Sequence, residues 1–263
     1  MSYYLFKNLK VHYSDQGNGP VLVLLHGFLE DLTMWKTLVD EFKKTTRVIC
    51  VDLLGHGKTE NLGYIHSMED QSEMLKQLLD SLNVKHYAMV GHSMGGYVAL
   101  AFADKYPDAL TGLCLMNSTA LADDKEKKRN RDRGIRAVKQ NHKTFIRLSI
   151  PNLFAEENRD PFSEEILKIT DAALKMTQQG VIAALEGMKI RKDRTKILEA
   201  GDFPILMIIG KKDPALDYQS LLQQSELGKV KKVVFEDGHM SHIENTTDLI
   251  KALKDFSNAI EEE

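Results

Sequence analysis

A serine surrounded by glycines is the first feature of this chain that could do chemistry. Ser93 lies in the stretch VGHSMGG at residues 90–96, with Gly91 two residues before it and Gly95 two residues after it. Where a strand turns sharply into a helix, one residue adopts an uncommon backbone conformation and its neighbours have no room for a Cβ atom, so glycines are needed there. The pattern G-x-S-x-G between a strand and a helix therefore predicts a nucleophilic serine above the edge of a sheet. The alternative is a tight turn whose serine only caps the helix.

A serine nucleophile needs a general base, and the chain offers two histidines in a suitable place. His239 and His242 lie in FEDGHMSHIE, directly after the last predicted strand. We favour His239 because it follows Gly238 in a tight loop, whereas His242 begins a helical turn. The pair also forms an H-x-x-H pattern, but no third ligand accompanies it, so no metal site is predicted. His26 and His92 are interpreted as supporting residues.

The base needs a carboxylate to orient it, and Asp213 is the candidate. It lies in IIGKKDPALD, in the loop that leaves a predicted strand, and it precedes the histidine in the order Ser, Asp, His. Asp217 competes with it but is interpreted as the cap of the next helix. Asp52 also follows a strand but precedes the serine, so we interpret it as a residue that anchors a loop.

The oxyanion formed during acyl transfer needs two hydrogen-bond donors. The Met94 N–H lies at the start of the helix after the serine, where the helix dipole favours negative charge. Gly27, in LLHGFLE, lets the chain turn after a strand, which would aim the Phe28 N–H at the same oxygen. An ordinary glycine turn would explain the glycine but not its place at the same edge of the sheet.

These groups must be positioned by an α/β fold. Short apolar runs alternate with helical patterns, and several runs are continuously apolar, as in strands covered on both faces. The predicted strands, about eight in number, fall at residues 3–6, 9–15, 21–25, 46–52, 86–90, 109–117, 204–210 and 231–237. The alternation predicts a mostly parallel, doubly covered sheet. The first two strands are joined without a helix and are expected to be antiparallel to it.

Helical periodicity divides the chain into a core and an insertion. Ser67 caps a predicted helix over 67–82, and a second amphipathic helix ends the chain at 246–263. Residues 121–200 hold no convincing strand but show helical patterns, including a long one over 164–189. We therefore predict a core made of residues 1–120 and 201–263, with a helical cap (lid) at 121–200 inserted after the sixth strand.

Composition narrows the possible partners. The formal net charge of −3 and the pI near 6.3 provide no basic field for nucleic acid. No apolar run is long enough for a membrane span or a signal peptide, so we expect a cytoplasmic protein without a membrane partner. Cys50 and Cys114 lie in strand-like runs and are expected to be buried without a disulfide. No cofactor is predicted, and the oligomeric state is not indicated.

Five segments resemble the α/β-hydrolase superfamily, in particular its serine-nucleophile, carboxylesterase-like branch with a helical cap. They are HGF at 26–28, DLLGHGKT at 52–59, GHSMGG at 91–96, GKKD at 210–213 and GHMSHIEN at 238–245. The resemblance implies Ser93, Asp213 and His239 as the catalytic triad. It also implies Phe28 and Met94 as the oxyanion amides.

Hydrolysis of a small carboxylic ester, or of a related acyl substrate, is the expected activity. Phe28, Leu29, Trp35 and Met94 are the expected lining of an apolar acyl pocket, with Tyr97 as a further substrate-binding residue.

Three questions stay open at this stage. The first is whether the basic stretch 125–139 is a solvated helix face or a receiver for an anionic substrate. The second is whether the protein is instead a carbon–carbon bond hydrolase or lyase of the same superfamily. The menaquinone-pathway synthase is the example, and it carries an arginine near the position of Tyr97 to hold carboxylates. The third is whether the protein is a non-catalytic receptor that keeps the triad to capture a ligand.

Overall fold

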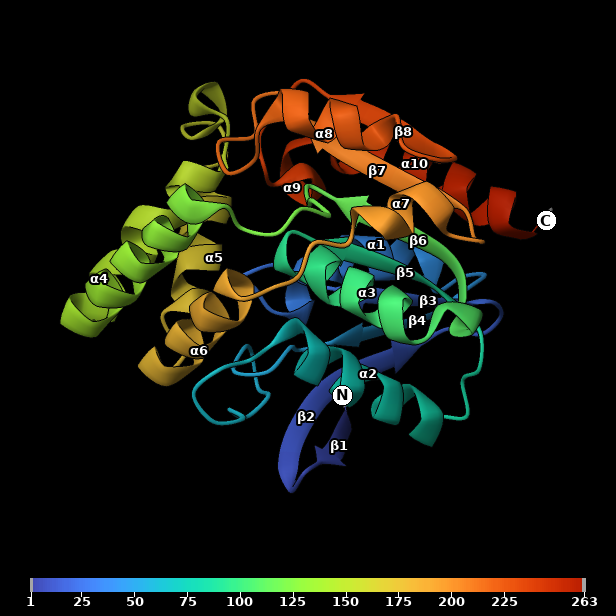
Figure 1. Cartoon of the computed structure of the whole chain (residues 1–263), viewed down its shortest axis with the longest axis horizontal. Coiled ribbons are helices and arrows are strands. Elements are labelled where there is room, and N and C mark those ends of the chain that lie inside the picture. The colour runs from blue at the N-terminus through green and yellow to red at the C-terminus, as the bar shows by residue number, and fades with distance from the viewer. Residues whose placement is uncertain (1, 262–263) are drawn as a thin grey trace.

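The computed structural model describes residues 2–261, in which eight strands form one sheet with the order β1-β2-β4-β3-β5-β6-β7-β8 (Figure 1). The strands are β1 (Ser2–Phe6), β2 (Leu9–Gln16), β3 (Val21–Leu25), β4 (Arg47–Val51), β5 (Tyr87–His92), β6 (Leu110–Met116), β7 (Ile205–Gly210) and β8 (Val230–Phe235). β1 pairs antiparallel with β2, and β2 antiparallel with β4, whereas all other neighbours are parallel. The prediction of a mostly parallel sheet of about eight strands is confirmed.

The sheet is covered on both faces because successive side chains of a strand point to opposite sides. In β3, Val23 and Leu25 belong to one apolar cluster and Leu22 and Leu24 to the other. The first cluster packs under α2 (Met68–Ser81), α3 (Met94–Lys105), α7 (Thr195–Ala200) and α8 (Tyr218–Ser225). The second packs under η1 (Leu32–Trp35), α1 (Lys36–Phe42) and α10 (Thr246–Glu261). Residues 262 and 263 of the predicted terminal helix lie outside the described residues.

Helices occupy the chain between β6 and β7, and Figure 1 shows α4, α5 and α6 together to one side of the sheet. These three are α4 (Lys125–Ser149), α5 (Ser163–Ala173) and α6 (Gln178–Lys189), with short 3-10 turns at Pro151–Leu153 and Glu156–Asn158, and α7 follows them before β7. The helical pattern predicted over 164–189 is two helices, because Thr177 caps α6 by accepting a hydrogen bond from the Gly180 N–H. A non-helical residue, Asn141, interrupts α4.

Helix α6 packs tightly against the loop before α2. A Cβ atom on Gly187 would lie 1.8 Å from the main-chain oxygen of His66, and the His66 N–H donates to the Ala183 oxygen at 3.0 Å. Gly180 approaches Gly55 in the same way, because a Cβ atom on Gly180 would lie 2.5 Å from the Gly55 oxygen. Small residues thus let one helix of the insertion contact the backbone of the rest of the chain directly.

The helices and the two cysteines bear on the predictions about a membrane and about a disulfide. Among residues 2–261, no helix combines the length and the apolar character needed to cross a membrane. Cys50 and Cys114 are buried without a disulfide, and burial raises the pKa of the Cys50 thiol to about 12. Neither thiol is therefore ionised near neutral pH.

Candidate active site

The turn that holds Ser93 is built by close backbone approaches. β5 ends at His92 and α3 begins at Met94, so Ser93 is the single residue between them, with φ 50° and ψ −114°. A Cβ atom on Gly91 would lie 2.4 Å from the Gly95 oxygen, and one on Gly95 would lie 2.3 Å from the Leu25 oxygen. Both glycines are therefore required for the turn, and the side chain of Ser93 does not make a capping hydrogen bond to the helix.

Three side chains from distant parts of the chain form a hydrogen-bonded row. The Nε2 atom of His239 lies 2.8 Å from Ser93 Oγ, and its Nδ1 atom lies 2.6 Å from Asp213 Oδ2. The carboxylate of Asp213 is fully buried and the imidazole of His239 is 3% exposed. The other carboxylate oxygen accepts hydrogen bonds from the N–H groups of Ala215 and Leu216. Since an ionised carboxylate only accepts, His239 carries its proton on Nδ1 and presents Nε2 as the acceptor for the serine hydroxyl.

Two main-chain amides at this edge of the sheet are without an acceptor. Within residues 2–261, neither the Phe28 N–H nor the Met94 N–H makes a hydrogen bond. Phe28 follows β3 and Met94 follows β5, and these two strands are parallel neighbours, so both amides leave the sheet at the same edge. Gly27 is needed beside them, because a Cβ atom there would lie 2.4 Å from Glu30 Oε2 and 2.7 Å from His92 Nδ1.

A buried carboxylate behind the row was not foreseen from the sequence. Glu30 Oε2 accepts a hydrogen bond from the Gly27 N–H at 2.9 Å and lies 2.7 Å from His92 Nδ1. Its Oε1 atom lies 3.5 Å from His242 Nε2. Sequence reasoning could have found the contact to Gly27, because an acidic residue three positions after a turn glycine often accepts from the turn. The contact to His92 spans 62 residues and has no local signal.

In this cluster Glu30 and His92 form a charged pair, and the His242 ring beside them is neutral. Burial by itself would raise the pKa of the Glu30 carboxyl, but the interactions with His92, and the weaker ones with His242 and His26, together lower it to about 2. Burial likewise opposes charge on His92, yet Glu30 holds the pKa of His92 above its ordinary value. Burial lowers the pKa of His242 to about 4, so that ring is neutral. His92 also lies, through Nε2, 2.9 Å from the main-chain oxygen of His239.

Asn117, at the end of β6, is a second residue that the sequence did not single out. Its side-chain nitrogen donates to the Gly238 oxygen at 3.1 Å and to Asp213 Oδ2 at 3.3 Å, and its side-chain oxygen accepts from Ser241 Oγ at 2.6 Å. It has a positive φ of 46°, which asparagine tolerates better than most residues. Asn117 thus connects the loops of the carboxylate and of the imidazole.

The alternative residues lie in other environments. Asp52 accepts from the Leu32 and Lys58 N–H groups and contacts His12 Nδ1 at 2.6 Å, so it anchors loops as interpreted. Asp217 accepts from the Ser220 N–H and caps α8. Within the described chain, no group of three His, Cys, Asp or Glu side chains is arranged to hold a metal ion.

A cavity of about 140 Å³ opens beside the row. Ser93 and His239 line it, together with Phe28, Leu29 and Tyr97 of the expected pocket. Trp35 does not line it, so its expected role is corrected. The indole is fully buried in the second core cluster, beneath the face of the sheet covered by α1 and α10. The side chain of Met94 is also buried in the core rather than in this lining.

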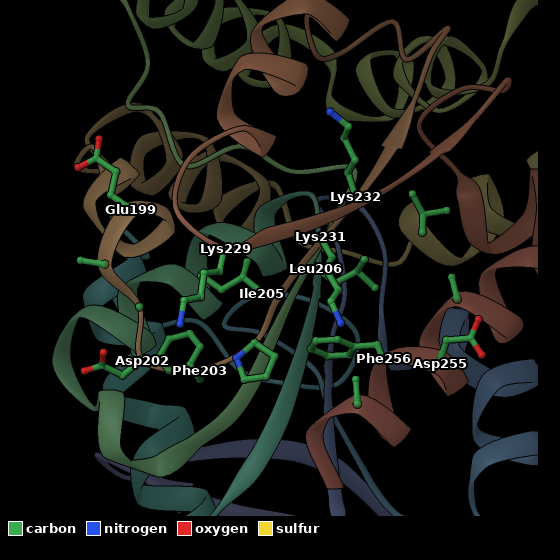
Figure 2. Close-up of a pocket in the computed structure, with 16 residues that line it drawn as sticks. Glu199, Asp202, Phe203, Ile205, Leu206, Lys229, Lys231, Lys232, Asp255 and Phe256 are labelled. Carbon is green, nitrogen blue, oxygen red and sulfur yellow. The ribbon is translucent and has the colours of Figure 1, made fainter. Parts of the chain in front are cut away.

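A larger cleft lies elsewhere and contains none of these groups. It has a volume of about 790 Å³ and is formed by the loop before β7, by β8 and by α10 (Figure 2). Three lysines, Lys229, Lys231 and Lys232, and two aromatic residues, Phe203 and Phe256, are among the residues that line it. The larger volume is therefore not at the cavity that Ser93 and His239 line.

Comparison with known proteins gives a family match and relatives of full length. The family model described as alpha/beta hydrolase fold matches residues 20–246. A Bacillus subtilis (strain 168) protein, named putative 2-succinyl-6-hydroxy-2,4-cyclohexadiene-1-carboxylate synthase, is 28% identical over 95% of this chain and 96% of its own length. The similarity to this relative therefore extends along nearly the whole chain.

Two solved structures are similar in fold. A thermophilic esterase from Thermogutta terrifontis, solved with malate bound, superposes with a TM-score of 0.91 and 32% identity, covering 96% of this chain and 94% of that chain. The enol-lactonase from Burkholderia xenovorans LB400 has a TM-score of 0.90 and 22% identity, covering 98% of this chain and 100% of that chain.

Proposed function

Because the chain belongs to the α/β-hydrolase family, we propose that it is a serine hydrolase that cleaves a small carboxylic ester through an acyl-enzyme. The observation that carries the proposal is the hydrogen-bonded row from Ser93 through His239 to Asp213, beside two amides without acceptors. The similarity to the Thermogutta esterase along most of both chains supports an ester as the substrate.

The proposed reaction begins with attack of Ser93 Oγ on the carbonyl carbon of the ester. His239 Nε2 takes the hydroxyl proton, and the imidazolium that forms is stabilised by Asp213. The carbonyl oxygen becomes an oxyanion and accepts hydrogen bonds from the Phe28 and Met94 N–H groups. Each such donor contributes on the order of 3 kcal/mol to lowering the barrier.

Collapse of this intermediate breaks the bond to the alcohol oxygen. His239 returns its proton to the departing alcohol, which leaves the acyl group on Ser93. Water then enters, gives a proton to His239 and attacks the acyl carbon, and the return of that proton to Ser93 releases the acid. The row needs no redox or metal chemistry for this sequence of steps.

Residues 121–200 act in this proposal as the cap over the cavity, with residues 1–120 and 201–263 as the core. Four side chains of the insertion line the cavity beside Ser93: Arg131, Ser149, Leu153 and Met188. The His239 N–H also donates to the Leu153 oxygen at 2.9 Å, so the insertion supports the loop of the base.

The test is a burst measurement with short-chain p-nitrophenyl esters. We expect a burst of p-nitrophenol in proportion to the enzyme concentration, and its loss in Ser93→Ala, with kcat lower by about 10³-fold or more. A fluorophosphonate probe should label Ser93 in the unchanged protein. Full activity in Ser93→Ala would reject the mechanism.

Cleavage of a carbon–carbon bond is the second candidate. The Bacillus relative, which is named as a synthase and not as an esterase, supports a reaction other than ester hydrolysis, and its similarity extends along nearly the whole chain. Tyr97, in place of an arginine near that position, argues against the same substrate. Loss of absorbance from a conjugated dienoate substrate, with no turnover of simple esters, would favour this candidate over the first.

A further inference from the structure

Two guanidinium groups share one buried carboxylate where the insertion meets the core. Asp123, whose side chain is fully buried, lies 2.5 Å from Arg191 Nη1 through Oδ1 and 3.1 Å from Arg131 Nε through Oδ2. One negative charge therefore faces two positive charges.

The two arginines differ in how fully they are bonded. Arg191 is 3% exposed and donates to Asp123 and to the oxygens of Leu121 and Met188, while its guanidinium lies 4.1 Å from the ring centre of Tyr97. Arg131 donates only through Nε. Within residues 2–261, no acceptor lies at hydrogen-bond distance from either Nη atom of Arg131, and its side chain is 24% exposed.

The unbonded end of Arg131 lies between two neighbouring cavities. Arg131 lines the cavity of about 140 Å³ that contains Ser93, and it also lines a second cavity of about 310 Å³. The two cavities share further lining residues, including Phe28 and Tyr97. Lys127, one helical turn before Arg131 on α4, lines the second cavity as well.

The second cavity carries an excess of positive charge. Its charged lining residues are Lys127, Arg131, Arg191 and a single carboxylate, Asp123. Among residues 2–261, Glu30 is the only carboxylate that lines the first cavity, and it is already paired with His92. In the part of the chain that the structure describes, neither cavity therefore has a further carboxylate in its lining that could pair with the Nη atoms of Arg131 or with Lys127.

We propose that Arg131 and Lys127 bind a carboxylate of the substrate, at a point remote from the carbonyl that Ser93 attacks. This rests on the proposed function, and it names the substrate class as an ester of a dicarboxylic acid or of a carboxylate-bearing alcohol. The planar fork of the two Nη atoms matches the two oxygens of a carboxylate, and a guanidinium loses less hydration than an ammonium on binding. Arg191 holds the insertion in place, and Arg131 makes the contact that selects the substrate.

The test compares matched esters in the unchanged enzyme and in Arg131→Met. Mono-p-nitrophenyl glutarate and p-nitrophenyl pentanoate form the acyl-side pair, and 4-acetoxybenzoate and p-tolyl acetate form the alcohol-side pair. For each pair the ratio of kcat/KM, anionic over neutral, is measured in both proteins, because intrinsic differences in ester reactivity then cancel. We expect the ratio to fall about ten- to hundredfold in Arg131→Met for one of the pairs. A fall smaller than tenfold for both pairs would overturn the proposal.

Two further variants keep the test decisive. Arg131→Gln keeps a hydrogen-bond donor for Asp123, so it replaces the methionine variant if that protein does not fold. Arg129→Met removes the same charge from an exposed position on α4 that does not line either cavity. We expect it to leave the ratio unchanged, and an equal fall in this control would show that net charge, rather than a site at Arg131, selects the substrate.

A binding measurement tests the proposed carboxylate site separately from the proposed hydrolase function. Glutarate is titrated by calorimetry into Ser93→Ala and into the double variant Ser93→Ala with Arg131→Gln. We expect binding at least about tenfold weaker in the double variant, and equal affinity would overturn the anion site. If no ester is hydrolysed by the unchanged enzyme, the proposed function fails, and this titration alone decides the site for the carboxylate.

Discussion

The Nε2 atom of His92 lies 2.9 Å from the main-chain oxygen of His239, although 147 residues separate them in the chain. The residue before the candidate nucleophile thus holds the loop of the candidate base. Glu30 orients His92 from the other side, through Nδ1, and also accepts from the Gly27 N–H. One buried carboxylate therefore connects the turn of the amide donor, the turn of the serine and the loop of the imidazole.

Glu30→Ala should destabilise the fold more than Glu30→Gln. The alanine variant leaves His92 and the Gly27 N–H without their partner, and breaking a buried ion pair costs about 3–5 kcal/mol. Glutamine can still accept from Gly27, so we expect a smaller loss. Urea unfolding at pH 7 measures both free energies, and equal losses in the two variants would contradict a role for the Gly27 hydrogen bond.

His239→Ala should lower kcat for p-nitrophenyl esters by about 10³- to 10⁴-fold, because the hydroxyl of Ser93 loses the acceptor that lies 2.8 Å away. The fraction of folded protein should fall far less than kcat does. The exposed His86 provides the control, and His86→Ala should keep full activity. Activity that survives in His239→Ala but is lost in His242→Ala would assign the base to the other histidine.

Two glycine-to-alanine changes should act in opposite directions. In Gly95→Ala the new Cβ atom would lie 2.3 Å from the Leu25 oxygen, which is backbone and cannot move aside, so the fold should lose several kcal/mol or fail to form. In Gly134→Ala the nearest atom is Leu185 Cδ1 at 3.6 Å, an ordinary contact. Alanine there should stabilise α4 by about 0.5–1 kcal/mol. Thermal unfolding of the two variants checks the contrast.

Stability should fall as the pH is lowered from about 6.5 to about 4. Burial lowers the pKa of His66 to about 4 and of His56 to about 3, so both rings are neutral in the folded chain. The unfolded chain has the ordinary histidine pKa of about 6.5 and binds protons in this window that the folded chain does not. Each such proton lowers the free energy of unfolding by about 1.4 kcal/mol per pH unit.

The pH prediction is checked by urea unfolding between pH 7.5 and pH 4.5. His92 acts in the opposite sense, since its raised pKa adds stability below about 6.5 that is lost as the pH rises through its folded value. His66→Gln has a side-chain oxygen that can reach the position of Nε2, so it keeps an acceptor for the Leu62 N–H and removes one titrating group, and its slope should be shallower. An unchanged slope in this variant would contradict the assignment to His66.

By itself, the sequence determined the features that depend on a residue and its near neighbours. The glycines beside Ser93 signalled a turn because backbone crowding is local, and continuous apolar runs such as 21–25 predicted strands covered on both faces. Ser93, Asp213 and His239 each follow a predicted strand, in this order along the chain. The meeting of these three side chains was expected, since the carboxyl ends of parallel strands lie at one edge of a sheet.

The tertiary structure decided which side each of the other residues faces. Trp35 and Leu29 lie close together in the sequence, yet Trp35 is in the second core cluster, whereas Leu29 is in the first cluster and lines the cavity. The basic stretch 125–139 looks uniform as a sequence, but the rotation and the docking of α4 turn Lys127 and Arg131 toward the cavity and leave Arg129 exposed. Contacts across long stretches of chain depend on packing, which local patterns do not record.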